Sequence, residues 1–343
     1  MTSPEAFTAL LKQLVAGETL DAEASSRAFA ALMSGEVSQI RMASFLTALA
    51  TREATVDEIV GAARAMRAAM HKVAAPAGAV DLCGTGGDGH GTLNVSTAAA
   101  FVVAACGVPV AKHGNRNMSS RTGTADVLEA LGVKIDIDAA TAERCLRVAG
   151  LSFLFAQTYH PAMKHVAPVR KELGFRTIFN LLGPISNPAG VRRQLLGIYS
   201  RHWIEPIAHV LAKLGTEKAW IVHGSDGLDE MTTTGTTHVA VLENGNVTVH
   251  EIAPEDAGLP RTTLAALKGG EPVENAAALR ALLDGAKGAY RDIVLLNAAA
   301  ALIVAGNATE LTAGVARAAD AIDSGRARAA LAKLIAVSQG APA

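Results

Sequence analysis

A glycine-rich segment with an embedded carboxylate is the first place where this sequence could do chemistry. Residues 84–88 read Gly-Thr-Gly-Gly-Asp and join an apolar run at 79–83 to a run of small residues that begins at Ser96. Glycine lets backbone N–H groups approach an anion, and the first turn of a following helix adds unpaired N–H groups. Asp88 would repel a phosphate unless a cation lay between them. The segment therefore suggests a phosphate site with a divalent metal or a cationic transition state.

The glycines alone leave a second interpretation open, because glycine-rich turns between a strand and a helix are common in α/β proteins. Residues 84–89 have the glycine spacing of G-x-G-x-x-G, but the extra glycine and the acid at its variable positions argue against a dinucleotide fingerprint. No Gly-Lys-Ser/Thr follows, which excludes a Walker loop. If the segment binds phosphate, another kind of phosphorylated ligand is needed.

A second polar cluster occupies residues 112–124, which read Lys-His-Gly-Asn-Arg-Asn-Met-Ser-Ser-Arg-Thr-Gly-Thr. It leaves the end of an apolar run at 108–112, and ligands bind beyond the carboxyl ends of strands in open α/β sheets. Lys112 and the backbone amides could neutralise a phosphate, while the hydroxyls could donate hydrogen bonds. The alternative is a solvated loop, although Gly114 and Gly123 permit the tight backbone path that a phosphate cradle needs.

A third cluster follows another apolar run and carries three acids, Asp226, Asp229 and Glu230, within five residues. Adjacent carboxylates are costly without a cation, and hard oxygen ligands suit Mg²⁺, which bridges to substrate phosphates. An exposed acidic turn is the alternative. Together with the phosphate signals, the metal interpretation is favoured.

A basic stretch contains His160, His165 and Arg170. Its histidines lack the i, i+4 spacing of helical metal ligands and are typical of structural groups. Arg170 differs because it precedes an apolar loop at 182–188, and a guanidinium beside apolar walls matches an aromatic carboxylate.

Length and composition narrow the class of protein. At 343 residues the chain suits two domains, or one large α/β domain with an appendage, and 50% hydrophobic residues supply a large core. A net charge of −1 gives no electrostatic footprint for nucleic acid. Three cysteines without paired spacing fit a reducing cytoplasm. We expect no secretory signal and no membrane span, because the longest apolar runs are too short and carry Gly, Pro or Asn.

The patterning predicts two structural units. Residues 1–73 show helical periodicity without a convincing strand, and residues 74–343 alternate short apolar runs with amphipathic segments, which is typical of α/β folds with a mainly parallel sheet flanked by helices. We expect the segment 161–190, with a helix over 161–173, to join the helical domain. Predicted strands are 79–83, 108–112, 151–157, 194–199 and 218–223, with a hairpin at 238–252; predicted helices are 96–106, 124–131, 139–149, 204–214 and several within 275–336.

Six motifs taken together resemble one family. They are Gly84-Thr-Gly-Gly-Asp88, Asn94-Val-Ser-Thr97, Lys112-His-Gly-Asn-Arg116, His160-Pro-Ala-Met-Lys164, Arg176-Thr-Ile-Phe-Asn-Leu-Leu-Gly-Pro184 and Gly227-Leu-Asp-Glu230. In this order they resemble the anthranilate phosphoribosyltransferases of tryptophan biosynthesis, and the resemblance runs through most of the chain. Departures are mild: Thr92 and Thr124 stand where the family often has serine, Ile185 replaces a common leucine, and Gly89-His-Gly91 is an unusual loop tip.

The resemblance implies a fold related to pyrimidine nucleoside phosphorylases, a homodimer formed through the helical domain, and two Mg²⁺ ions per subunit. The implied phosphoribosyl pyrophosphate residues are Gly84, Gly87, Asp88, Thr92, Asn94, Val95, Ser96, Thr97, Lys112, His113, Gly114, Asn115, Arg116, Asn117, Met118, Ser119, Ser120 and Thr124. The implied anthranilate residues are Gly84, His113, Asn115, His160, Arg170, Gly183 and Pro184, and the implied Mg²⁺ ligands are Ser96, Asp229 and Glu230.

The activity implied by this resemblance is transfer of the 5-phosphoribosyl group to the amine of anthranilate with release of pyrophosphate. The weakly nucleophilic aniline nitrogen favours a transition state like an oxocarbenium ion, so no general base is needed and the sequence names no catalytic residue. Asp88 would organise metal-bound water or face the ribosyl cation. Two alternatives are a pyrimidine nucleoside phosphorylase and a non-catalytic relative that binds nucleic acid. The acids at 229 and 230 and the segment 112–116 favour the transferase.

Overall fold

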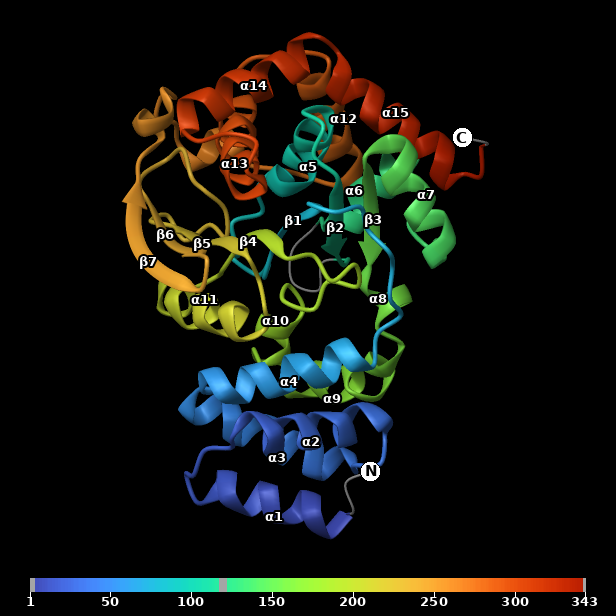
Figure 1. The fold of residues 1–343 in the computed structure, drawn as a ribbon, viewed down its shortest axis with the longest axis vertical. Helices are drawn as coiled ribbons and strands as arrows, with labels where there is room; N and C mark the ends of the chain where they lie inside the picture. The colour runs from blue at the N-terminus through green and yellow to red at the C-terminus, as the bar shows by residue number, and fades with distance from the viewer. Residues whose placement is uncertain (1–3, 117–121, 342–343) are drawn as a thin grey trace.

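Four helices at the beginning of the chain form one end of the molecule. The computed structural model describes residues 4–116 and 122–341. These helices are α1 (Pro4–Val15), α2 (Ala22–Ser34), α3 (Gln39–Arg52) and α4 (Val56–Ala68). Side-chain caps fix two of the helix starts: Asp21 accepts from the N–H of Ala24, and Thr55 and Glu58 form a capping box. Figure 1 shows the four helices stacked below the part that carries the sheet.

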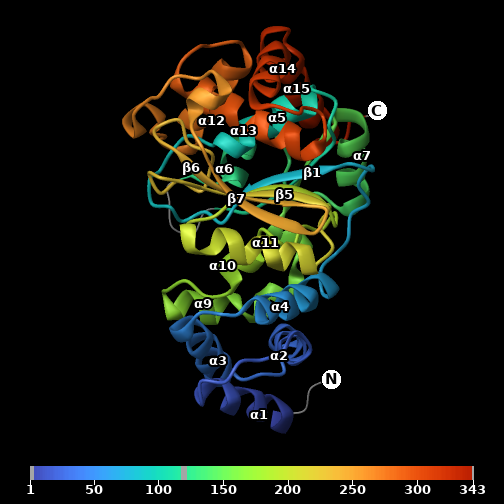
Figure 2. The same cartoon turned by 60° about the vertical axis from the view of Figure 1, so that its left-hand side comes forward.

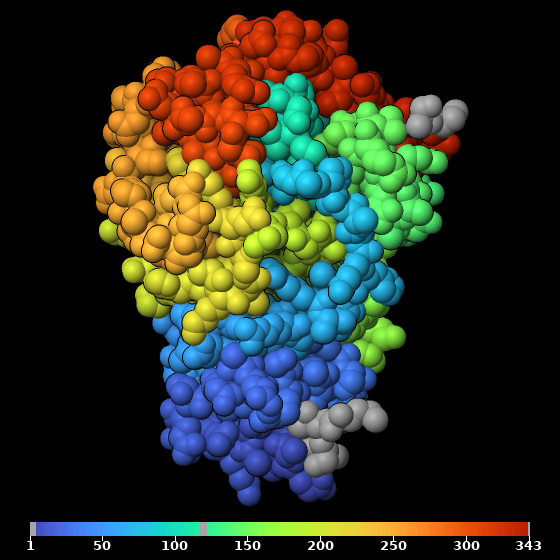
Figure 3. Space-filling view, viewed as in Figure 1, coloured from blue at the N-terminus to red at the C-terminus, as the bar shows by residue number. Residues whose placement is uncertain are grey.

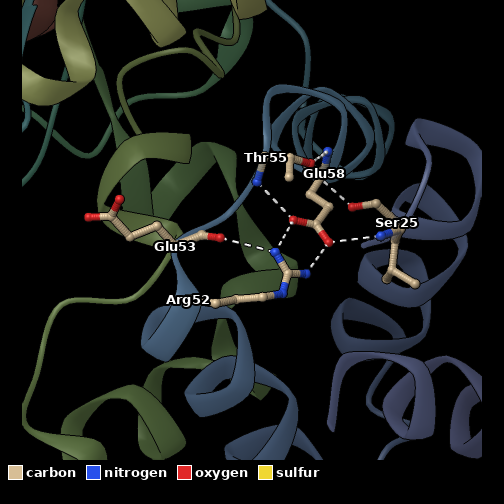
Figure 4. A network of polar contacts seen from close by, with 6 residues as sticks. Ser25, Arg52, Glu53, Thr55 and Glu58 are labelled. Atoms are coloured by element: carbon tan, nitrogen blue, oxygen red, sulfur yellow. Dashed lines mark hydrogen bonds and ion pairs between the residues drawn. The ribbon is translucent and has the colours of Figure 1, made fainter. Parts of the chain in front are cut away.

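A buried carboxylate joins three of these helices (Figure 4). The Glu58 side chain accepts from the N–H groups of Leu20 at 2.9 Å and Thr55 at 2.8 Å, and Arg52 forms an ion pair with it. The Ser25 hydroxyl donates to the Glu58 carbonyl at 2.6 Å. Every oxygen of this buried group is thus paired, which satisfies the requirement for placing a charge in a core.

One seven-stranded sheet carries the loops at which the sequence predicts ligands. Its strands lie in the order β3-β2-β1-β4-β5-β6-β7. Strands β1 to β5 pair in parallel, and β6 and β7 add an antiparallel hairpin at one edge. The bounds are β1 (Val80–Gly84), β2 (Val110–Gly114), β3 (Leu151–Phe155), β4 (Arg193–Gly197), β5 (Lys218–Gly224), β6 (Thr237–Glu243) and β7 (Asn246–Ile252). The mainly parallel sheet, the strand positions and the hairpin are as predicted.

Helices cover both faces of the sheet, as Figure 2 shows. In β5, Trp220 and Val222 join one hydrophobic core while Ala219 and Ile221 join the other, as the period of two dictates. The first core contains α5 (Val95–Ala105), α6 (Thr124–Ala130), α7 (Ala139–Ala149), α12 (Pro272–Leu283), α13 (Ala289–Ala305), α14 (Leu311–Asp323) and α15 (Arg326–Ser338). The second contains α11 (Ile204–Lys213) and α1 to α4, so the helical end and the lower face of the sheet share one core, and Figure 3 shows their surfaces meeting without a break. Nowhere in residues 4–116 and 122–341 is a helix long and apolar enough to cross a membrane.

The segment between β3 and β4 differs from its prediction. In place of one helix over 161–173, α8 (Ala156–Tyr159) is followed by the 3-10 turn η1 (Pro161–His165) and then by α9 (Ala167–Leu173). Pro168 has no N–H to donate to a preceding carbonyl, so the helix is interrupted before it, and α9 begins at Ala167 with the proline in its first turn. The chain continues into α10 (Phe179–Leu182), and these pieces contact α2, α3 and α4.

Candidate functional site

The glycine-rich loop leaves the carboxyl end of β1 and turns over the end of β5. Gly86 and Gly87 adopt φ values of 65° and 75°, a region that favours glycine. The N–H of Gly86 donates to Asp229 Oδ2 at 2.6 Å. Asp88 caps the next turn, because its Oδ1 accepts from the N–H of His90 at 3.0 Å. The loop and the acidic cluster, far apart in sequence, therefore form one site.

The end of this loop, at Thr92 and Asn94, contacts residues that come much later in the chain, between 268 and 290. Thr92 forms an isolated β-bridge with Lys268. Asn94 is held twice, because its Oδ1 accepts from Asn275 Nδ2 at 3.0 Å and its carbonyl accepts from the Tyr290 hydroxyl at 3.0 Å. These contacts fix the point at which the loop becomes α5.

The first turn of α5 meets the second polar cluster. Lys112 is buried in β2, and its Nζ donates to Ser96 Oγ at 3.1 Å and to the Leu82 carbonyl. The Thr97 and Thr124 hydroxyls lie 3.2 Å apart. A helix start with an ammonium group and hydroxyls is suited to an anion such as a phosphate.

Two acids from the third cluster complete this arrangement. The Glu230 carboxylate accepts from the N–H of Ser96 at 3.1 Å. Burial and the Asp88 charge raise the pKa of Asp229, while burial and the Asp229 charge raise the pKa of Glu230 to about 8. Among the described residues, Lys112 is the cation that lowers the pKa of Glu230. A buried and a half-buried acid with so little neutralising charge around them fit a bound divalent cation.

The third acid of that cluster does not join the site. Asp226 Oδ2 accepts from the hydroxyls of Thr232 at 2.7 Å and Thr234 at 2.5 Å, so its role is to close a turn. Within the described ranges, protein side chains alone make no group of three or more His, Cys, Asp or Glu able to hold a metal ion. A metal held by Asp229 and Glu230 would need other oxygen ligands, such as those of a substrate or water.

Two residues that help to place the acids, Asn297 and Gly197, were not predicted from the sequence, whereas Gly84 was. Asn297 in α13 accepts from the Met231 N–H at 3.0 Å and donates to the Met231 carbonyl at 2.8 Å. A methyl group at Gly84 or Gly197 would collide with Asp229. The only available sequence signal was an asparagine inside the apolar run 293–306.

A pair of buried histidines lies at the end of β2. His113 Nε2 and His160 Nε2 are 3.2 Å apart, so one ring donates a hydrogen and the other accepts it. Burial lowers the pKa of His113 to about 3, with a further contribution from His160, and burial lowers that of His160 to about 4. Both rings are therefore neutral near pH 7. His113 also bonds to the backbone of Gly183, and Gln194 Nε2 donates to the Pro184 carbonyl at 2.7 Å, which holds this loop beside the pair.

Arg170 lies on α9 with its guanidinium carbon 5.4 Å from the centroid of the Phe179 ring. Burial lowers the pKa of Arg170. Among the residues that the structure describes, no carboxylate or hydrogen-bond acceptor is recorded for this guanidinium. A largely buried cation without an anion is suited to receive one from a ligand.

The remaining predicted residues are less closely joined to the site. Arg116 forms ion pairs with Asp126 and Glu129 on α6 and not with Asp229 or Glu230. The Asn115 side chain accepts from the Arg116 N–H at 2.8 Å. Val95 belongs to the hydrophobic core, and Gly114 ends β2. The predictions for Asn117, Met118, Ser119 and Ser120 fall outside the described residues.

Comparison with known proteins now identifies the family. Residues 8–70 match the helical bundle domain of a glycosyl transferase family, and residues 76–328 match the α/β domain of that family. An anthranilate phosphoribosyltransferase from Rhodopseudomonas palustris (strain BisB18) is 59% identical, covering 98% of this chain and 99% of that protein. The one from Parvibaculum lavamentivorans is 57% identical over 97% of this chain and 98% of its own length. The chain belongs to the anthranilate phosphoribosyltransferase family.

Solved structures of anthranilate phosphoribosyltransferases agree with the fold. The crystal structure of the enzyme from Thermus thermophilus has a TM-score of 0.92 and 45% identity, covering 96% of this chain and 99% of that chain. The enzyme from Saccharomyces cerevisiae in complex with PRPP and Mg has a TM-score of 0.90 and 28% identity, covering 98% of this chain and 99% of that chain. The helical bundle and the mainly parallel sheet flanked by helices are thus those of anthranilate phosphoribosyltransferases.

Proposed function

We propose that this protein transfers the 5-phosphoribosyl group of phosphoribosyl pyrophosphate to the amine of anthranilate, releasing pyrophosphate. The observation that carries the proposal is that the glycine-rich loop and the helix start after it are hydrogen-bonded to the paired acids. The Gly86 N–H donates to Asp229, and the Ser96 N–H donates to Glu230. The related Saccharomyces cerevisiae enzyme has been solved with PRPP and Mg and, separately, with 4-fluoroanthranilate.

Phosphoribosyl pyrophosphate would lie against the start of α5. Lys112, the hydroxyls of Ser96 and Thr97, and the N–H groups of residues 84–97 would hold its phosphates. Asp88 would face the ribose, whose ring becomes cationic during transfer. For Asn117 to Ser120 the proposal rests on the family resemblance.

Ser96, Asp229 and Glu230 would hold Mg²⁺, with two ions per subunit. These residues fit the ion because Asp229 is buried, Glu230 is half-buried, and both carboxylates are short of neutralising charge. When bound, Mg²⁺ supplies positive charge to the departing pyrophosphate. The Gly86 and Ser96 N–H groups hold the two carboxylates in place.

Anthranilate would bind with its carboxylate on Arg170, because that guanidinium is largely buried and has no anion among the described residues. Asn115 and Gly84 would complete this subsite. The neutral pair His113 and His160, with Gly183 and Pro184, would line the path of the aromatic ring.

The reaction then depends mainly on positioning and on stabilising the leaving group. Because the aniline nitrogen is a weak nucleophile, the bond from C1 to the pyrophosphate oxygen is largely broken before attack. The chain holds the two substrates in line and excludes water, and its N–H donors and Lys112 stabilise the developing charge on pyrophosphate. No side chain is assigned as a general base, since the proton of the amine can leave after the new bond forms.

We further propose that residues 1–73, together with 161–190, form the helical domain, that residues 74–343 form the substrate domain, and that two copies pair through the helical domain. The matched bundle at 8–70 and the contacts of α9 and α10 with α3 and α4 support the first part. The three thiols are unpaired, which supports a cytoplasmic location.

The test follows the fluorescence of anthranilate while phosphoribosyl pyrophosphate and Mg²⁺ are added separately and together. We expect the signal to decay only when both are present, with one pyrophosphate released per anthranilate consumed. Persistent fluorescence with all components present would falsify the proposal. Cleavage of a pyrimidine nucleoside by inorganic phosphate would favour the phosphorylase instead.

A further inference from the structure

The side chain of Arg170 faces the ring of a buried phenylalanine. Phe179, which lies nine positions further along the chain, is 3% exposed, and its ring centroid is 5.4 Å from the guanidinium carbon. A cation over an aromatic face is attracted by the ring quadrupole, more strongly where water is excluded. Because this guanidinium has no other partner within residues 4–116 and 122–341, the ring is the feature that orients it.

That ring is itself held by a column of aromatic side chains. Phe29 of α2 packs against Phe179 with centroids 5.6 Å apart and planes at 62°. Phe45 of α3 packs against Phe29 at 5.7 Å, and Phe7 of α1 packs against Phe45 at 5.3 Å. Phe29 and Phe45 are fully buried. Edge-on and tilted contacts of this kind fix the plane of each ring, so the face of Phe179 is presented in one orientation.

A fixed guanidinium matters because arginine has a long and mobile side chain. Ordering such a side chain on binding costs free energy, and a side chain that is already ordered avoids this cost. Bidentate contact with a carboxylate also requires the plane of the guanidinium to be set. The helix that carries Arg170 has only seven residues and ends at Gly174, so its backbone alone provides little restraint.

We infer that Phe179 is a positioning residue that, supported by Phe29, holds Arg170 ready for the anthranilate carboxylate. This inference rests on the proposed function. The helical end of the molecule would then contribute to substrate selectivity through this column, without touching the substrate.

The first experiment compares Phe179→Leu with Phe45→Leu in the full-length protein. Both changes remove one buried ring, but only the first removes the face beneath Arg170. For Phe179→Leu we expect the KM for anthranilate to rise roughly three- to thirtyfold, because a partly desolvated cation–π contact is lost. The KM for phosphoribosyl pyrophosphate should stay within about twofold. Phe45→Leu should lower the melting temperature and raise the KM for anthranilate much less than Phe179→Leu does, because Phe45 reaches Phe179 only through Phe29.

A second experiment keeps the shape of the ring. Phenylalanine at 179 is replaced by analogues with one, two and three ring fluorines, which weaken the negative face while nearly preserving volume. We expect the logarithm of the KM for anthranilate to rise steadily with each fluorine, and Phe179→Tyr, which keeps the face, to stay near the parent value. This series remains decisive if Phe179→Leu fails to fold.

Three outcomes would each overturn the positioning role of Phe179. They are equal rises in both KM values, a rise in the KM for anthranilate in Phe45→Leu as large as in Phe179→Leu, and a flat response of that KM to fluorination. A parent protein that makes no phosphoribosylanthranilate would instead overturn the proposed function. The two failures are therefore separable, because only the first is read against an active parent.

Discussion

Two acidic sites in this protein differ in how far the chain itself neutralises their charge. Glu58, in the helical bundle, accepts from two backbone N–H groups and pairs with Arg52, so its charge is fully met within the chain. At the edge of the sheet, Asp229 accepts from the Gly86 N–H and Glu230 from the Ser96 N–H, and the two acids lie beside one another and near Asp88. Their pKa values are raised in consequence.

The difference shows how a buried acid that holds a fold can be told from one that awaits a ligand. A structural carboxylate without its partners would destabilise the protein, so its partners are built into neighbouring helices. A carboxylate at a binding site can remain short of positive charge, because the ligand brings it. The same contrast applies to Arg52, which has its anion, and Arg170, for which none is recorded in the described part of the chain.

The largest effect is expected where the pairing is complete. Glu58→Ala would leave Arg52 and the N–H groups of Leu20 and Thr55 without their acceptor, and we expect the unfolding free energy to fall by about 3–5 kcal/mol. Urea denaturation measures this unfolding free energy. Glu23→Ala, which breaks an exposed pair with Arg27, is the control and should change it by less than about 0.5 kcal/mol. A fall in unfolding free energy no larger for Glu58→Ala than for Glu23→Ala would contradict the structural role of the Glu58 carboxylate.

The acids at the sheet edge should behave in the opposite way. For Asp229→Asn combined with Glu230→Gln we expect the Mg²⁺ concentration needed for half-maximal activity to rise roughly tenfold or more. Without Mg²⁺ the unfolding free energy should be unchanged or higher by about 1–2 kcal/mol, because repulsion and burial of charge are relieved. Mg²⁺ titration and urea denaturation test both parts, and an unchanged Mg²⁺ requirement would count against the metal role.

The histidine pair should make stability depend on pH. The folded His160 stays neutral down to about pH 4, whereas in the unfolded chain it takes a proton below about pH 6.5. The unfolded state therefore binds more protons in this window, and stability falls as the pH falls, by at most about 1.4 kcal/mol per pH unit for each histidine. His160→Gln should flatten the curve of unfolding free energy between pH 6.5 and 4. An equally steep curve in the variant would argue against a buried neutral His160.

The smallest effect is expected at a surface ion pair between the helical end and the sheet. Lys213 Nζ on α11 lies 2.6 Å from Asp57 Oδ1 on α4, and both side chains are about half exposed. Lys213→Ala should change the unfolding free energy by less than about 0.5 kcal/mol, because solvent and salt screen such pairs. A loss above about 2 kcal/mol in thermal or urea denaturation would show that exposure alone does not separate strong from weak pairs here.

The sequence predicted most of the elements but not all of their ends. The strands near 80, 110, 151, 194 and 218 were placed within one or two residues, because alternating or continuous apolar runs between glycines are local signals. The helix expected over 161–173 is instead divided at Val166, and the local signal for this break, Pro168, was not used. The unpaired Arg170 was expected beside apolar walls, but the identity of the ring beneath it could not be derived, since Phe179 and Phe29 come from separate elements.

By itself the sequence determined the chemical inventory: glycines where the backbone must take positive φ, hydroxyls and a lysine at a helix start, and adjacent acids after a strand. Only the tertiary structure decided which of these groups meet. Gly86 and Asp229 are 143 positions apart and come together because only β4 separates β1 from β5 in the sheet. Turn and helix preferences act over a few residues, whereas the neutralisation of a buried charge depends on packing across the whole fold.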